Sequence, residues 1–140
     1  MEQALIESRR PSLDQAQRAI AAAFAEAQRD GARMAAAVVD DRGHPICCAR
    51  MDGTPERVLR FAIRKAYTAA VMGRDTLAFK KQMEEASRTL ADYGDPMFTT
   101  LQGGHVVLGE GQVVGAVAVG GNNARRDEEI ASIALNALGL

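Results

Sequence analysis

The sequence lacks an excess of either charge: 17 Lys and Arg stand against 18 Asp and Glu, for a formal net charge of −1. A chain of this kind has no general attraction for nucleic-acid phosphates or anionic lipids. It also lacks any apolar run near the roughly 18 residues that a membrane span requires, and its first ten residues hold no apolar core of a signal peptide. We therefore expect no nucleic-acid partner, no membrane partner and a cytoplasmic location.

Cysteine and histidine are scarce, with two of each in 140 residues. Cys47 and Cys48 are adjacent in a strand-like stretch, so their side chains point to opposite faces and cannot share a metal ion. A disulfide between neighbours would be strained, and the chain has no C-x-x-C or H-x-x-x-H spacing. We expect two reduced thiols and no structural zinc site.

The remaining composition is that of one globular domain, which we place at residues 1–140. Hydrophobic residues make up 47% and charged residues 25% of a chain that is too short for two ordinary domains.

Four segments carry helical spacing. A capping box formed by Ser12 and Gln15 opens the first helix, and Gly73 is expected to close the second. Asp127 and Glu128 lie in the first turn of the last helix, where they complement its dipole. The predicted helices run from 13 to 30, from 55 to 72, from about 76 to 90 and from 125 to 140.

Five segments are predicted as strands: 34–40, 45–51, 98–100, 105–109 and 112–120. Short turns join the first pair and the last pair, so the sequence predicts an antiparallel α+β sheet flanked by helices rather than a Rossmann fold. Neither face of the strand 112–120 is polar, which is expected where both faces are covered. Because four short helices cover two faces thinly, we expect a homo-oligomer.

Three blocks of the sequence, VVDDRGHPICCARMDG, AIRKAYTAA and GGHVVLGEGQVVGAVAVGGNNARRDEEIASIAL, together resemble the GlcG/HbpS family. That family includes the C-terminal domain of PduO-type proteins. The resemblance implies a profilin-like antiparallel sheet, dimers or larger oligomers and, in some members, binding of haem or a corrinoid-pathway cofactor. The chain departs from the family pattern at Val106, where proline is usual, and at Gly120, where serine is usual.

His105 follows Gly103 and Gly104, which leave room for a ligand or another backbone at the strand edge. In one interpretation His105 is a haem or metal ligand, or an acid/base near neutral pH. In the other it is a strand-edge residue bonded to a backbone carbonyl. His44 lies in a hairpin turn, where solvent exposure is common.

Arg50 and Lys65 are charges in apolar, small-residue surroundings, and the family blocks contain both. Each could hold a carboxylate of a substrate or a haem propionate, or pair with an acid such as Asp40 or Asp52 at a subunit contact. Thr68 follows Lys65 by one helical turn, so both could reach one ligand. Packing is the simpler role for Thr68.

Three functions remain open. The first is an oligomer that binds haem or a related tetrapyrrole through Arg50, Lys65, Thr68 and the edge formed by Gly103, Gly104 and His105. The second is a cofactor-free enzyme of carboxylic-acid or aromatic-acid catabolism, in which His105 is the general acid/base and Arg50 or Lys65 holds the carboxylate. The third is an assembly or sensor protein without catalysis.

Overall fold

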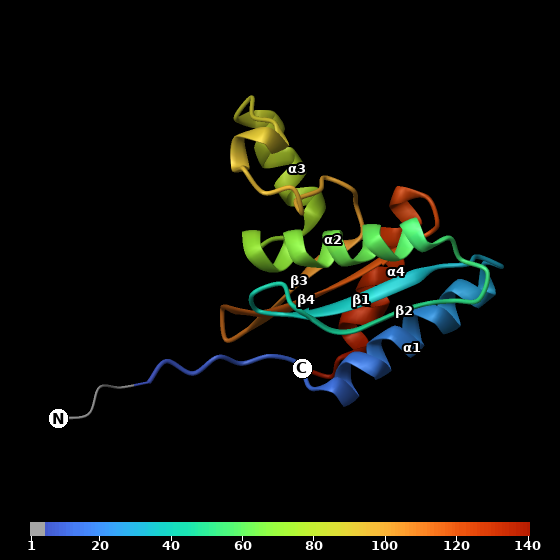
Figure 1. The fold of residues 1–140 in the computed structure, drawn as a ribbon. Coiled ribbons are helices and arrows are strands. Elements are labelled where there is room, and N and C mark those ends of the chain that lie inside the picture. The colour runs from blue at the N-terminus through green and yellow to red at the C-terminus, as the bar shows by residue number, and fades with distance from the viewer. Residues whose placement is uncertain (1–4) are drawn as a thin grey trace.

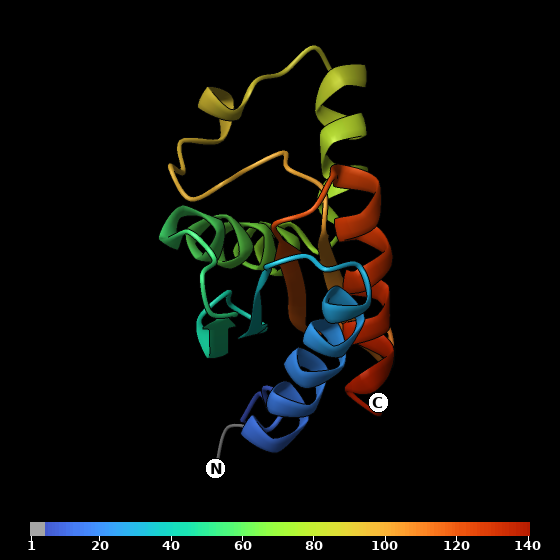
Figure 2. The ribbon, with the colours of Figure 1, turned by 90° about the vertical axis from the view of Figure 1, so that its right-hand side faces the viewer.

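A sheet with helices on both faces forms the body of the computed structural model, which describes residues 5–140 (Figures 1 and 2). The helices are α1 (Leu13–Arg29), α2 (Glu56–Met72), α3 (Thr76–Glu85) and α4 (Ala124–Ala137), with a 3-10 turn η1 (Leu90–Tyr93). The strands are β1 (Ala35–Asp40), β2 (Pro45–Arg50), β3 (Gly104–Gly109) and β4 (Gln112–Gly120). Helix α2 covers one face of the sheet, and α1 and α4 cover the other (Figure 2).

The four strands are antiparallel and lie in the order β2-β1-β4-β3. The turn between β3 and β4 has positive φ at both central residues, 53° at Glu110 and 79° at Gly111, which is the twist that two-residue hairpins favour. The predicted α+β class, both hairpins and the antiparallel pairing are therefore confirmed.

The predicted fifth strand at 98–100 is not formed, and the sheet of the described residues has four strands. The N–H of Thr99 donates to the Thr68 hydroxyl (3.0 Å), and the N–H of Leu101 donates to the Thr99 hydroxyl (3.2 Å). The N–H of Phe98 closes a turn onto the carbonyl of Asp95 (3.2 Å). Because nearby groups satisfy these donors, the segment runs as a loop without a strand partner.

Small side chains let α2 lie close to the sheet. The buried contacts between them are made largely by alanines, from Ala35, Ala37, Ala116 and Ala118 on the strands and from Ala62, Ala66 and Ala69 on the helix. The opposite face packs against α1 and α4 through larger residues such as Val38, Val117 and Ile130. One chain thus covers both faces of its own central strands, so the sheet faces do not require a second subunit.

Local signals set most helix ends. The capping box of Ser12 and Gln15 is present, and Gly73 ends α2 with φ of 68°. Helix α3 ends at Glu85 rather than near 90, because Ser87 takes a left-handed φ of 54° and η1 follows. Together α3 and the segment after it project beyond α2 (Figure 1). Within residues 5–140, none of the helices combines the length and apolar character that crossing a bilayer requires.

Candidate functional site

The most deeply buried charge of the site belongs to Lys65, in the middle of α2. Its Nζ donates to the carbonyl oxygen of Val119 at 2.8 Å and to Asp127 Oδ2 at 3.1 Å. Lys65 is 3% exposed and Asp127 4%. The pair joins the helix on one face of the sheet to the first turn of the helix on the other face.

The glycines next to His105 make room for this lysine. A Cβ on Gly103 would lie 2.8 Å from the Val119 carbonyl oxygen and 3.1 Å from Lys65 Nζ. A Cβ on Gly104 would lie 2.6 Å from the carbonyl oxygen of Lys65, closer than real Cβ atoms approach. The two glycines therefore allow the backbone of α2 and the Lys65 ammonium to approach the sheet.

Burial acts on both members of the pair. It is the largest influence on Lys65 and lowers its pKa, although the Asp127 carboxylate acts in the opposite direction. It likewise raises the pKa of Asp127, against the effect of the Lys65 ammonium. Burial thus opposes the charged form of each group while the charge of the partner supports it, and the nitrogen holds its proton less firmly than an exposed lysine would.

A cavity of about 390 Å³ opens beside Lys65, a size within the range of small-molecule sites. Its lining includes three large apolar side chains, Val58, Phe61 and Leu101, together with Arg57, Lys65, Gln102, Gly120, Gly121, Asn122, Ala124 and Asp127. We call this space the Lys65 cavity. An ammonium has three N–H groups, and the structure gives two of those of Lys65 a protein partner.

His105 lies outside the Lys65 cavity. Strand residues alternate between faces, so Gly104 contacts α2 whereas His105 faces α4, where its Nε2 lies 3.0 Å from Glu128 Oε1. Its partner is thus a carboxylate rather than the backbone carbonyl considered from the sequence. Burial lowers the pKa of His105, but the hydrogen bond to Glu128 and the charge of Asp75 outweigh it, so the pKa is raised overall.

The other predicted site residues also lie apart from the cavity. Thr68 is fully buried; its hydroxyl donates to the Arg64 carbonyl (2.8 Å) and accepts from the N–H of Thr99 (3.0 Å), which is a packing role. Arg50 is exposed on β2 and donates to the Thr54 carbonyl at 3.2 Å. Of the six predicted residues, Lys65 lines the cavity and Gly103 lies directly behind its ammonium.

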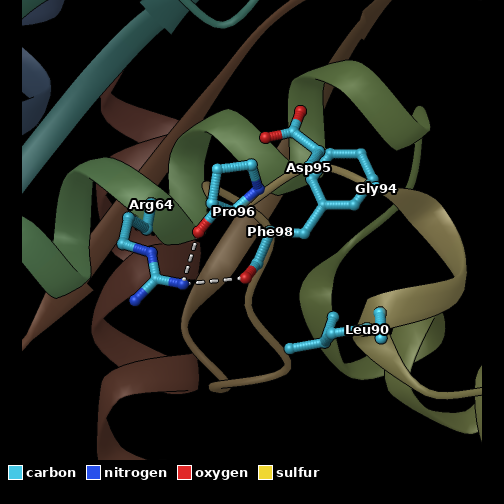
Figure 3. Close-up of a pocket in the computed structure, with 7 residues that line it drawn as sticks. Arg64, Leu90, Gly94, Asp95, Pro96 and Phe98 are labelled. Carbon is cyan, nitrogen blue, oxygen red and sulfur yellow. Dashed lines mark hydrogen bonds between the residues drawn. The ribbon is translucent and has the colours of Figure 1, made fainter.

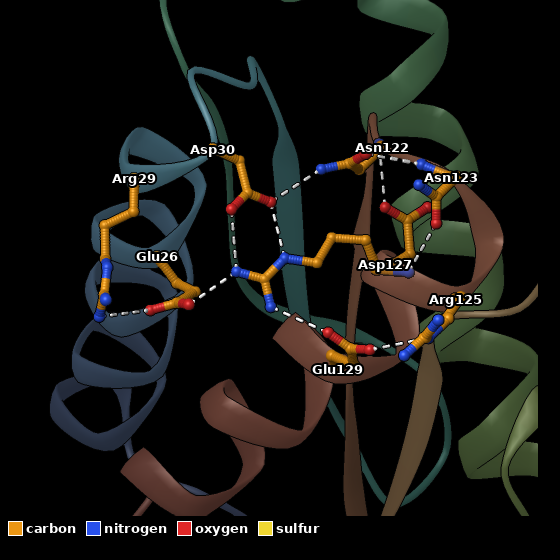
Figure 4. Close-up of polar contacts among 9 residues, drawn as sticks. Glu26, Arg29, Asp30, Asn122, Asn123, Arg125, Asp127 and Glu129 are labelled. Carbon is orange, nitrogen blue, oxygen red and sulfur yellow. Dashed lines mark hydrogen bonds and ion pairs between the residues drawn. The ribbon is translucent and has the colours of Figure 1, made fainter.

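A network of polar contacts connects the cavity to the surface (Figure 4). The Asn122 side chain donates to Asp30 Oδ2 at 3.0 Å, and the Asn122 backbone N–H donates to Asp127 Oδ1 at 2.9 Å. Arg126 then joins Asp30 and Glu26 of the α1 end to α4, with contacts of 2.6 Å to each. Both oxygens of Asp127 are therefore engaged, one by Lys65 and one by Asn122.

A second cavity, of about 330 Å³, lies between α2 and the loop that follows η1 (Figure 3). Arg64 donates to the carbonyl oxygens of Pro96 (3.0 Å), Met97 (3.3 Å) and Phe98 (2.9 Å). Through these three hydrogen bonds to backbone carbonyls, Arg64 holds the loop against α2.

The sequence reasoning missed Asp127 as the partner of Lys65, and Arg57, Gln102 and Asn122 as cavity residues. One signal was available for the pair. Asp127 falls on the apolar face of its helix, at the spacing of Ile130, Ala131 and Ala134, and Lys65 falls on the apolar face of α2 with Ala62, Ala66 and Ala69. A basic residue on the buried face of one helix and an acidic residue on the buried face of another are expected to form an ion pair, because a buried charge requires a partner.

The fold and the cavity together define a single-sheet α+β domain with an open, ligand-sized cavity. The sequence pattern of the family described as "Haem degrading protein HbpS-like" matches residues 12–136, and the chain belongs to that family. Protein GlcG of Escherichia coli strain K12 is 38% identical over 100 residues, which cover 71% of this chain and 73% of GlcG.

Solved structures agree with this assignment. A double mutant of HbpS from Streptomyces reticuli superimposes with a TM-score of 0.88 at 29% identity, over 100% of this chain and 96% of HbpS. A PduOC–haem complex superimposes with a TM-score of 0.82, over 91% of this chain and 94% of PduOC; at 22% identity this likeness concerns the fold alone. The resemblance to the GlcG/HbpS family is confirmed.

Proposed function

We propose that this protein binds haem or a related tetrapyrrole at the Lys65 cavity. The family to which it belongs is described as haem degrading, and a relative of the same fold, PduOC, has been solved as a haem complex. These relatives support a tetrapyrrole as the class of ligand, and the residues of this chain support the Lys65 cavity as the binding site.

The observation that carries the proposal is the mixed lining of the cavity. Val58, Phe61 and Leu101 offer apolar surface to a flat macrocycle, and Leu101 is 45% exposed. Arg57 is exposed and has no ion-pair partner within residues 5–140. A tetrapyrrole with peripheral carboxylates presents the complementary surface, since guanidinium groups bind carboxylates in a bidentate manner.

The side chains that line the cavity suit a tetrapyrrole ring and its carboxylates. They include no histidine that could bind the iron of a haem. Neither His44 nor His105 lines the cavity, and the Nε2 of His105 is held by Glu128. The proposal therefore concerns the macrocycle and its carboxylates, and it assigns no iron ligand.

Titration with haemin tests this proposal. A Soret band that saturates with added protein is expected, and Phe61→Ser should weaken binding by roughly tenfold, which corresponds to about 1.4 kcal/mol of lost apolar contact. Leu108→Ser is the matched control, because Leu108 is an exposed apolar residue (55%) on β3, away from the cavity. Unchanged haemin affinity in Phe61→Ser, with the fold intact by circular dichroism, would reject the site.

We also infer a cytoplasmic homo-oligomer. Since the sheet faces are covered within one chain, the support for assembly comes from exposed apolar side chains of one loop, Met97 (37%) and the cavity residue Leu101 (45%), which a partner could cover. Light scattering at micromolar concentration checks this inference, and a species of about 15 kDa, the mass of one chain, would reject it.

The enzyme alternative, with His105 as general acid/base, draws support from its contact with Glu128, which orients the ring. A pH profile of any detected turnover, with and without His105→Ala, tests that alternative.

A further inference from the structure

Lys65 is the one lysine of the chain that is buried. The other two, Lys80 and Lys81, are exposed on α3. A lysine removed from water beside a cavity can act as a nucleophile, because its uncharged amine carries a free electron pair. The binding function proposed above makes no use of this property.

We propose that Lys65 forms a reversible imine with small carbonyl compounds that carry a carboxylate, and that Arg57 binds the carboxylate. This inference goes beyond tetrapyrrole binding, because it assigns a covalent reaction and a second class of ligand to the floor of the same cavity.

Space beside the amine is the first support. Position 120, which lines the cavity, is a glycine, and a Cβ there would lie 3.4 Å from Lys65 Nζ. No side chain at this position covers the nitrogen, and Lys65 itself lines the cavity. The carbonyl of Val119 and the carboxylate of Asp127 fix the nitrogen from the other directions, so the third direction is the one open to a ligand.

A proton acceptor in contact with the amine is the second support. Asp127 Oδ2 lies 3.1 Å from Nζ and can take the ammonium proton as the carbonyl ligand enters. The free amine then attacks the carbonyl carbon, and a proton moves from nitrogen to oxygen to give the carbinolamine. Asp127 returns its proton to the hydroxyl, which leaves as water, so the ammonium and the carbonyl become a protonated imine and one water molecule. No oxidant or reductant is needed.

The charge of the cavity selects the ligand class. The Lys65 ammonium and the Asp127 carboxylate balance each other, whereas Arg57 adds a positive charge without an ion-pair partner within residues 5–140. Gln102 adds an amide to the same lining. A small 2-oxo acid carries a carbonyl next to a carboxylate, so it offers one group that reacts with an amine and one that binds a guanidinium, and the cavity lining contains both.

Borohydride trapping on the wild-type protein tests the reaction. Haem-free protein is incubated with pyruvate at neutral pH and reduced, and peptide mass spectrometry measures the adduct at each lysine. We expect labelling of Lys65 to exceed that of Lys80 and Lys81 by about tenfold or more, because a buried amine with a lowered pKa is unprotonated more often. Labelling spread equally over the three lysines, or confined to Lys80 and Lys81, would overturn the proposal.

Two variants and a second probe test the ligand class. Arg57→Ala should reduce trapping of pyruvate at Lys65 by about tenfold and leave trapping of propanal, which has no carboxylate, unchanged. Arg60→Ala is the matched control, since Arg60 is an exposed arginine of the same helix that does not line the cavity. An equal loss of pyruvate trapping at Lys65 in Arg57→Ala and Arg60→Ala would reject the role of Arg57. Haemin titration is a separate measurement, so failure of haem binding and failure of imine formation are distinguishable.

Discussion

Arg126 and Asp127 are neighbours in the first turn of α4, and their side chains serve opposite environments. Arg126 contacts Glu26, Asp30 and Glu129 at the surface of the molecule (Figure 4). Asp127 turns inward and meets a single cation, Lys65. The Arg126 network has more contacts and shorter ones, yet the buried pair has the chemical consequences, because its side chains are 4% and 6% exposed whereas those of Arg126, Glu26 and Asp30 are 21–25% exposed.

The physical difference lies in the solvent. The hydrogen bonds that Arg126 donates to Asp30 raise the pKa of Arg126 and lower the pKa of Asp30, so both groups remain charged. Solvent screening nevertheless makes exposed ion pairs weak contributors to stability. A buried pair loses its hydration, and each charge then depends on the other. Contact number is therefore a poor guide to the importance of a charged group.

The largest expected effect follows from removing one member of the buried pair. Asp127→Ala should lower the free energy of unfolding by about 3–5 kcal/mol, because the Lys65 ammonium is left buried without its counter-ion. Denaturant unfolding measures the loss. The double variant Lys65→Met/Asp127→Leu should recover much of it, and a double variant no more stable than Asp127→Ala would contradict this account.

A smaller loss is expected where the sheet supports Lys65. Gly104→Ala brings a Cβ within 2.6 Å of the Lys65 carbonyl oxygen, and the backbone shift that relieves the clash should cost about 1–3 kcal/mol. Thermal unfolding checks this value. Gly109→Ala serves as the control, since Gly109, like Gly104, lies outside the left-handed φ region, and the atom nearest a Cβ there is a Val114 side-chain methyl at 3.1 Å rather than a backbone atom. Equal losses of stability in the two variants would show that the backbone clash is not the cause.

The contact of His105 with Glu128 should make stability depend on pH. The folded pKa of His105 is raised, so its stabilisation is fully present below the unfolded value of about 6.5 and is lost as pH rises through the folded pKa. His105→Gln should therefore cost about 1 kcal/mol near pH 6 and less near pH 9. Unfolding curves at several pH values measure the difference, and a cost independent of pH would contradict the assigned partner. Haemin affinity should not change, because His105 does not line the cavity.

The smallest effect is expected at the surface. Arg126→Ala should reduce stability less than any substitution above, and high salt should narrow the gap between variant and wild type, because salt screens exposed charges. Melting temperatures at low and high ionic strength check this. A loss comparable with that of Asp127→Ala would show that the network, rather than the buried pair, holds α4 in place.

Local sequence signals predicted most of the fold. The capping box at Ser12, the stop at Gly73 and the hairpin turn at Gly111 each follow from the conformational preferences of a few adjacent residues. The strand at 98–100 was predicted from composition alone, and it failed because the side chain of Thr68, far away in the sequence, takes the backbone donor of Thr99.

The site was less predictable, because it depends on contacts between distant segments. Lys65 was identified as a charge in apolar surroundings, but Asp127 was interpreted only as a complement to the helix dipole. Gly103 and Gly104 were correctly expected to permit a close approach; that the approaching group is the backbone of α2 follows only from the fold. Arg57 carries no signal in its sequence context, since exposed arginines on helices are common.

The two edges of the sheet, β3 and β2, differ in whether their outer backbone groups are free to pair with another strand, which bears on aggregation. Two outward N–H groups of β3 are already occupied, that of Gly104 by the Thr76 hydroxyl (3.1 Å) and that of Val106 by the Asp75 carboxylate (2.9 Å). Within residues 5–140, strand β2 pairs with β1 alone, so its outer backbone groups form the edge that another strand could join. A sheet can grow from molecule to molecule without limit only if both of its edges can pair with another strand. The start of α3 blocks the β3 edge, so pairing through the β2 edges would stop at two molecules.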